Sequence, residues 1–245
     1  MIEEFIKYTD SYKKYGEMID LKINHTFRVK DLCLEIAKSL GLNEEEEHLA
    51  ELCGLLHDIG RFEQWKEYKS FKDLQTIDHG DLGVELLKNN NFINKFSTYN
   101  HDTILKAVKY HNKYKVPNTL SDKNKLFVNI TRDADKIDIL YLASKKKINV
   151  NTENTKMNKQ VYNSLLNGKC IKKGAIKTKA DLVAIYLGFI FDINYRISYK
   201  VMKERGYFDT IIDNQIKETN NKEFKEQLKV LQEVINKRIE EMILC

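Results

Sequence analysis

The chain has 245 residues, of which 42% are hydrophobic and 31% are charged, and its formal net charge is +5. This composition supports a sizeable core and excludes a globally disordered chain. The excess positive charge is spread along the sequence rather than gathered in one arm. So mild a positive balance would suit an anionic substrate and is weak evidence for nucleic-acid binding.

The sequence gives no sign of secretion or of a membrane span. The longest apolar run, residues 182–191, falls far short of the roughly 20 residues that cross a bilayer. The N-terminal residues lack the basic flank and apolar core of a secretory signal, and the four cysteines form no CxxC pair. We therefore expect a cytoplasmic protein with reduced cysteines and no membrane partner.

Secondary structure is expected to be helical throughout. One proline and ten glycines leave few sites for hairpins, and apolar residues recur at helical spacing. Residues 61–77 are expected to be irregular apart from a short helical turn. Helices are predicted over residues 3–17, 24–40, 43–60, 79–90, 101–113, 123–144, 155–167, 178–205 and 222–243.

The domain organisation is expected to be simple. We predict one all-α domain over residues 1–245, with a helical core at about 20–145 and a C-terminal helical extension at about 146–245. The amphipathic stretch 224–243 has two alternative partners, its own domain or a second subunit in a homo-oligomer.

Four of the six histidines lie on the apolar faces of four different predicted helices: His25, His57, His79 and His111. A single histidine in such a place is more often a hydrogen-bonded core residue than a ligand. Four of them together favour a metal site, because such sites in helical bundles are built from side chains on facing helices. The remaining two, His48 and His101, are expected at the surface and at a helix start.

The stretch LLHDIGRF (55–62) places Asp58 directly after His57 among apolar residues. An aspartate in such a position is rarely buried unless it is paired or binds a metal. Adjacent helical residues project about 100° apart, so the two side chains can approach one ion from two directions, and a carboxylate can also bridge two ions. Imidazole and carboxylate ligands without a cysteine suit Mn, Fe, Co, Ni, Mg or Zn and argue against a structural thiolate zinc site.

A second group of inward acids lies in RDADKIDIL (132–140). Asp133 and Asp135 belong to neighbouring apolar stripes of the predicted helix, so periodicity does not choose between them as ligands. The alternative for this segment is a helix whose acids pair with Arg132 and Lys136.

Five segments that carry these residues follow one another in a distinctive order: HTFRV (25–29), LAELCGLLHDIGRF (49–62), DHGDLGVELL (78–87), ILKAVKYHN (104–112) and RDADKIDIL (132–140). This series, over about residues 20–145, resembles the HD superfamily of metal-dependent phosphohydrolases. The resemblance implies an HD-like helical bundle that binds a first metal through four ligands: His25, His57, Asp58 and Asp135. It favours Asp135 over Asp133, because alanine precedes Asp135 and lysine follows it.

By the same resemblance, His79 and His111 match positions that complete a second metal in two-metal members. Such members often carry two successive histidines where this chain has His111 followed by Asn112. The sequence therefore leaves the number of metals, one or two, open.

The resemblance also implies metal-assisted hydrolysis of a phosphate ester or anhydride, with a nucleotide as the substrate class by analogy. Asp58 would act as ligand and bridge, and Arg61 is the favoured cation for the phosphate oxygens. Other cations beside the motifs have a surface position or an acidic partner as their alternative: Arg28, Lys109, Lys113 and Lys136. Three nearby aromatic residues are candidates for stacking on a base or for packing: Trp65, Tyr68 and Phe71.

Three other functions are compatible with parts of this pattern. A non-catalytic HD-like sensor would bind a nucleotide or a metal and signal through the C-terminal helices. A di-iron oxygenase of the same fold would bind iron tightly and consume oxygen. A helical nucleic-acid-binding protein would show salt-dependent binding that survives the loss of His57 and Asp58.

Overall fold

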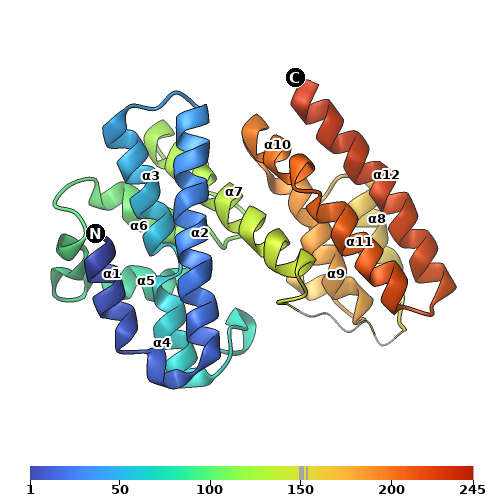
Figure 1. Ribbon diagram of the computed structural model, residues 1–245, viewed down its shortest axis with the longest axis horizontal. Helices are drawn as coiled ribbons and strands as arrows, with labels where there is room; N and C mark the ends of the chain where they lie inside the picture. Colours follow the sequence, from blue (N-terminus) through green and yellow to red (C-terminus); the bar gives the residue numbers. More distant parts are fainter. Residues whose placement is uncertain (149–151, 153, 245) are drawn as a thin grey trace. The chain divides into compact units, whose positions relative to one another are not determined.

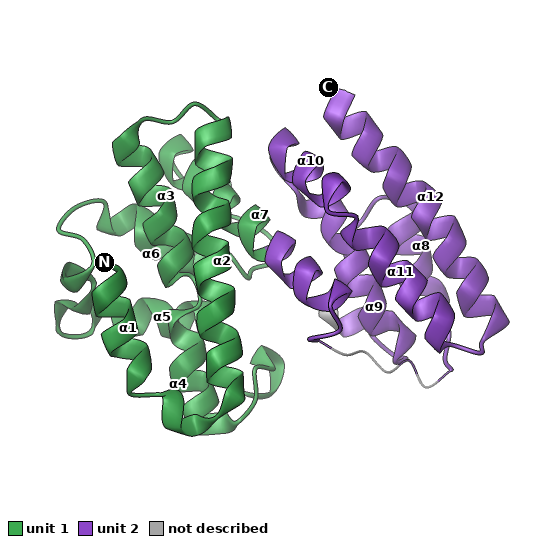
Figure 2. Cartoon of the chain, viewed as in Figure 1, with its two compact units in different colours: residues 1–135 green, residues 136–245 purple. Residues whose placement is uncertain are grey.

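The computed structural model describes residues 1–148, 152 and 154–244, so the fourth cysteine, Cys245, lies outside the described residues. The described chain is helical and contains no strand, which confirms the prediction of an all-α protein. It divides into two compact units, residues 1–135 and 136–245 (Figure 2). That the two units form a single domain stays a prediction. Among the described helices, none has the length and apolar character needed to cross a membrane.

Unit 1 contains the helices that carry the predicted site (Figure 1). Its helices are α1 (Ile2–Asp10), α2 (Glu17–Ser39), α3 (Glu44–Leu56), α4 (Ile59–Tyr68), α5 (His79–Lys88), α6 (His101–Tyr110) and the first part of α7 (Asp122–Ser144), which continues into unit 2. Short 3-10 turns occupy Lys13–Tyr15, Asp73–Gln75 and Asn89–Lys95. Helix α2 packs along α3, α4 packs against α5, and α5 packs against α6. The fully buried ring of Phe5 holds α1 to this group through edge-on contacts with Phe27 and Phe62.

The ends of α2 and α3 follow from local sequence signals. Gly41, at φ 70°, adopts the left-handed conformation that ends α2. Asn43 and Glu46 accept hydrogen bonds from each other's backbone N–H groups, and this reciprocal cap starts α3. The start of α2 was predicted too late, because Gly16, at φ 100°, lets the chain turn into the helix well before residue 24. His25 consequently lies inside a long helix rather than at its beginning.

The prediction of one helix over residues 43–60 is wrong at its C-terminal end, where the helix is interrupted between α3 and α4. Asp58 leaves the helical backbone conformation, at φ −104° and ψ 18°, and α4 begins at Ile59. The new helix covers residues 59–68, most of which were predicted to be irregular. His57 and Asp58 therefore lie at a junction of two helices and not along one continuous helix.

Two glycines allow the helices around this junction to approach closely. A Cβ atom on Gly60 would lie 2.2 Å from the carbonyl oxygen of His79 and 2.8 Å from the nitrogen of Gly83, so α4 and α5 touch backbone to backbone. A Cβ atom on Gly54 would lie 2.9 Å from Cα of Lys30, where α3 meets α2. Larger residues would hold these helices apart. The first of the two contacts sets the start of α5, and with it His79, beside the junction.

Unit 2 consists of the end of α7 followed by α8 (Lys159–Leu166), α9 (Ala180–Gly188), α10 (Arg196–Glu204), α11 (Tyr207–Glu218) and α12 (Lys222–Leu244), with 3-10 turns at Lys173–Ala175 and Phe189–Asp192. The predicted C-terminal helix is confirmed as α12, which packs against α10 and α11. The single helix predicted over residues 178–205 is wrong, because the chain divides into α9 and α10. Helix α11 was not predicted, although its buried residues recur at helical spacing: Tyr207, Phe208, Ile211, Ile212 and Gln215.

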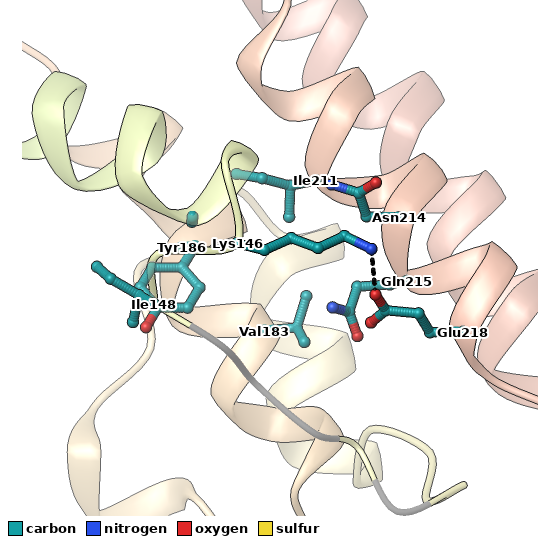
Figure 3. A pocket seen from close by; sticks show the side chains of 9 residues that line it. Lys146, Ile148, Val183, Tyr186, Ile211, Asn214, Gln215 and Glu218 are labelled. Carbon is teal, nitrogen blue, oxygen red and sulfur yellow. Dashed lines mark hydrogen bonds and ion pairs between the residues drawn. The ribbon is translucent and has the colours of Figure 1, made fainter.

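Unit 2 also contains a small, partly open cavity of about 20 Å³ beside the end of α7, α9 and α11 (Figure 3). The ion pair between Lys146 and Glu218 lies along it, and the buried Oε1 atom of Gln215 has no hydrogen-bond partner among the described residues. A cavity of this size holds about one water molecule, which would supply the missing donor. We therefore assign this cavity a structural role.

Candidate metal centre

The six predicted metal ligands converge within unit 1 from five places in the fold. His25 lies on α2, and His57 and Asp58 lie at the α3–α4 junction. His79 is the first residue of α5, His111 directly follows α6, and Asp135 lies on α7. The four imidazoles and Asp58 are at most 3% exposed, and the side chain of Asp135 is 14% exposed. The helical packing therefore brings together residues that lie up to 110 positions apart in the sequence.

One part of the cluster surrounds the Oδ2 atom of Asp58. His25 Nε2 lies 3.4 Å and His57 Nε2 lies 3.5 Å from this oxygen, and the two nitrogens are 3.2 Å apart. Asp135 closes the group, with its Oδ1 atom 3.2 Å from His25 Nε2. Of the two aspartates between which periodicity does not choose, Asp135 is therefore the one that joins these imidazoles.

The other part of the cluster surrounds the Oδ1 atom of the same aspartate. His79 Nε2 lies 3.3 Å and His111 Nε2 lies 3.5 Å from Asp58 Oδ1, and these nitrogens are 2.9 Å apart. Asp58 thus presents each of its two oxygens to a different pair of imidazoles, an arrangement that would allow this carboxylate to bridge two ions.

Hydrogen bonds on the far side of the rings fix which nitrogen of each ring faces the cluster. Nδ1 of His57 donates to the carbonyl of Gly54 at 2.7 Å, and Nδ1 of His111 donates to the carbonyl of Val108 at 2.8 Å. Because these acceptors require the proton on Nδ1, the neutral rings direct the Nε2 lone pairs into the cluster. Lone pairs that face one another cannot hydrogen-bond, whereas a shared divalent cation accepts them all. The donor set therefore fits a metal ion.

Comparison with known proteins gives the family of this part of the chain. The family model for the HD domain matches residues 23–140 of the chain. Residues 23–140 are an HD domain. All six clustered ligands fall inside the matched residues, and the HD superfamily broadly comprises metal-dependent phosphohydrolases. The chain has no significant match among curated proteins or among solved structures.

An aspartate that the sequence did not single out supports the second part of the HD cluster. The carboxylate of Asp73 accepts a hydrogen bond from Nδ1 of His79 at 2.9 Å and another from Arg61 at 2.8 Å. Burial alone would raise the pKa of Asp73, but the hydrogen bond from His79 and the charge of Arg61 hold the pKa well below its usual range. The ionised carboxylate fixes the His79 ring with Nε2 inward. Asp73 lies in a stretch predicted to be irregular, where helical periodicity carries no information.

Burial also sets the protonation state of His111. Desolvation lowers the pKa of this imidazole to about 4, and the neighbouring rings of His79 and His57 act in the same direction against the nearby carboxylate of Asp58. The ring is consequently neutral at pH 7, as a metal ligand must be.

Two cations lie beside Asp58, one near each oxygen. Arg61 Nη1 donates to the side chain of Gln64, the carbonyl of Phe71 and Asp73, while its buried Nε lies 3.6 Å from Asp58 Oδ1 and has no hydrogen-bond partner among the described residues. Lys22 Nζ donates to Asp58 Oδ2 at 2.6 Å. Burial alone would raise the pKa of Asp58, but the charge of Lys22 holds this pKa well below its usual range. Sequence reasoning missed Lys22, although it lies one helical turn before His25.

Three of the other cations that were predicted to bind phosphate lie close to acids other than Asp58. Lys109 lies 3.7 Å from Asp81, and Lys113 pairs with Asp78 and Asp81 on the α5 side. Lys136 pairs with Asp192 at 3.0 Å, both within unit 2. Arg28 is half-buried on α2, one turn after His25.

The other residues noted in the sequence lie around the HD cluster or away from it. His101 donates from Nε2 to the carbonyl of Ser97 at the start of α6, and His48 is 48% exposed on α3. Asn112, which stands where a second histidine is common, donates to the Asp78 carboxylate at 3.1 Å.

Proposed function

We propose that this protein is a metal-dependent phosphohydrolase that cleaves a phosphate ester or anhydride, with a nucleotide as its substrate class. The observation that carries the proposal is the position of Asp58, whose two oxygens face two separate pairs of imidazoles. His25, His57, Asp58 and Asp135 would hold one divalent ion, and His79 and His111 would share Asp58 with a second. The nitrogen and oxygen donors suit Mn, Fe, Co, Ni, Mg or Zn.

When bound, divalent metal supplies the acidified water and the polarised phosphoryl oxygen that phosphate hydrolysis requires. Asp58 would fix the spacing between the two parts of the site, because each of its oxygens faces a different pair of imidazoles. Asp73 holds the His79 ring with its proton on Nδ1.

Arg61 is suited to bind the phosphate. Three acceptors hold Nη1, which fixes the guanidinium, while the unpartnered Nε–H remains near Asp58 Oδ1. A phosphoryl oxygen would satisfy this buried donor, and arginine binds such oxygens through a planar set of N–H groups. Arg28, Lys109 and Lys136 are weaker candidates for this role.

The test is release of phosphate or pyrophosphate from a panel of nucleotides and simple phosphoesters, with Mn, Co, Ni, Mg and Zn added in turn. We expect metal-dependent turnover that is lost in Asp58→Asn and retained in His48→Gln, a control at an exposed histidine of α3. Tight metal binding without turnover on any compound would contradict the proposal and favour the sensor. Oxygen consumption by the iron-loaded protein would favour the oxygenase.

A further inference from the structure

The side chain of Lys22 is a mostly buried ammonium group with a single hydrogen-bond partner. It is 15% exposed, and its Nζ donates to Asp58 Oδ2 at 2.6 Å. Asp58 is its one hydrogen-bond acceptor and ion partner in the described residues. An ammonium carries three N–H donors, so two of them have no protein acceptor. The donors of a mostly buried ammonium group call for further acceptors, and this group lies beside Asp58 at the candidate metal centre.

Lys22 and Arg61 stand on either side of the shared carboxylate. Lys22 lies near Oδ2, which faces His25 and His57, and Arg61 Nε lies 3.6 Å from Oδ1, which faces His79 and His111. Both cations also lie over the ring of Phe71, with Lys22 Nζ 5.6 Å and Arg61 Cζ 5.5 Å from its centroid. Phe71 thus makes a cation–π contact with each of the two positive charges.

We propose that Lys22 is a phosphate-binding residue that works with Arg61, and that the pair selects a terminal phosphate dianion over a phosphodiester. This inference rests on the proposed function. When divalent ions share the charge of Asp58, its oxygens become weaker acceptors, and the ammonium donates to a phosphoryl oxygen instead. A terminal phosphate offers three acceptor oxygens and close to two negative charges, which matches two cations beside the ions. A phosphodiester offers fewer free oxygens and one charge.

The first test measures binding of inorganic phosphate to the Mn-loaded protein by isothermal titration calorimetry, at concentrations below those at which manganese phosphate precipitates. We expect Lys22→Met to weaken phosphate binding by about tenfold or more, as the loss of a charge-assisted hydrogen bond implies. Lys22→Arg should keep most of the affinity. Lys30→Met is the matched control, since Lys30 is a buried lysine of the same helix that pairs with Asp31 and Glu51.

Manganese binding, measured in the same variants without phosphate, separates phosphate binding from a purely structural role. The proposal requires Lys22→Met to bind Mn at least as tightly as the wild type while binding phosphate more weakly. Unchanged phosphate affinity in Lys22→Met would overturn it, and so would a loss of phosphate affinity that merely follows a loss of Mn. If Lys22→Met does not fold, Lys22→Gln takes its place in the same comparison.

Methyl phosphate and dimethyl phosphate test the substrate class. Wild type is expected to bind methyl phosphate at least about tenfold more tightly than dimethyl phosphate, and Lys22→Met should reduce this preference. Equal binding of the two compounds would overturn the selection of a terminal phosphate. These outcomes are separate from those of the turnover panel. Phosphate binding that depends on Lys22, without turnover of any compound, would reject the hydrolase and keep the phosphate site. Turnover together with phosphate binding that does not depend on Lys22 would keep the hydrolase and reject the phosphate site.

Discussion

Nε2 of His79 lies 2.9 Å from Nε2 of His111, while Nδ1 of each ring donates its proton to an acceptor on the far side. Two neutral rings in this arrangement place lone pairs against each other. That relationship is unfavourable for the protein alone and favourable with a cation bound between the rings, and it makes metal binding measurable as added stability.

Manganese should therefore raise the melting temperature of the protein, and a chelator should reverse the rise. Binding to the folded state alone adds about 2.7 kcal/mol at a free metal concentration one hundred times the Kd. A thermal melt with and without Mn measures the shift. We expect His111→Gln to reduce it and His101→Gln to leave it intact, because His101 hydrogen-bonds Ser97 outside the cluster. An equal melting temperature of the wild type with and without Mn would contradict a metal site.

Replacing Asp73 with asparagine should weaken metal binding without unfolding the protein. The amide loses the charge that holds the His79 ring, and such supporting residues commonly contribute about 10- to 100-fold in metal affinity or activity. Calorimetric titration with Mn checks the prediction. Asp81→Asn is the control, since Asp81 is half-exposed and pairs with Lys113. Equal affinities in the two variants would show that Asp73 does not support the site.

Gly60→Ala should disrupt both stability and the second half of the cluster. The new methyl group would lie 2.2 Å from the carbonyl oxygen of His79, a backbone atom that can move only if α5 moves. We expect a loss of at least about 1–3 kcal/mol in the free energy of unfolding, measured by denaturant titration, together with weaker Mn binding.

A second glycine provides the comparison for this variant. Nothing lies within 4 Å of a Cβ built on Gly174, so Gly174→Ala should cost little. If both variants unfold at the same denaturant concentration, the close contact of α4 with α5 is not the cause of any loss.

Below neutral pH, the chelator-treated protein should lose stability between about pH 6.5 and pH 4. The pKa of His111 falls to about 4 in the folded protein from 6.5, so within this window the unfolded chain binds the extra proton and stability falls with falling pH. The full effect is on the order of 3 kcal/mol. Unfolding free energies measured across this range should show a smaller slope in His111→Gln. An equal slope in that variant would assign the effect to other groups.

Much of the site could be predicted because its residues obey helical spacing. His25, His79 and His111 lie among apolar neighbours on amphipathic helices, and the scarcity of proline and glycine left helix as the default. Two of the supporting charges, Lys22 and Asp73, could not be found in this way. Charged residues beside a motif are usually solvated, and their contacts with Asp58 and His79 depend on which segments pack together.

The interruption between α3 and α4 could not be predicted from the sequence, for a different reason. Nothing in residues 55–62 forbids a continuous helix, since the stretch has no proline and its glycine follows the break. The interruption accompanies the close packing of Gly60 on His79 and Gly83, a tertiary contact that local propensity does not report. Local signals did place the boundary between α2 and α3, where Gly41 and the Asn43 cap act within a few residues.

The sharing of Asp58 between two pairs of imidazoles has a thermodynamic consequence. An ion held beside Oδ2 would withdraw electron density from the carboxylate, so an ion beside Oδ1 would meet a poorer donor. Two such binding events would be negatively cooperative, with the same coupling free energy in whichever order they occur. Binding of two ions to this protein would accordingly give a biphasic metal titration, in which the first ion lowers the affinity for the second.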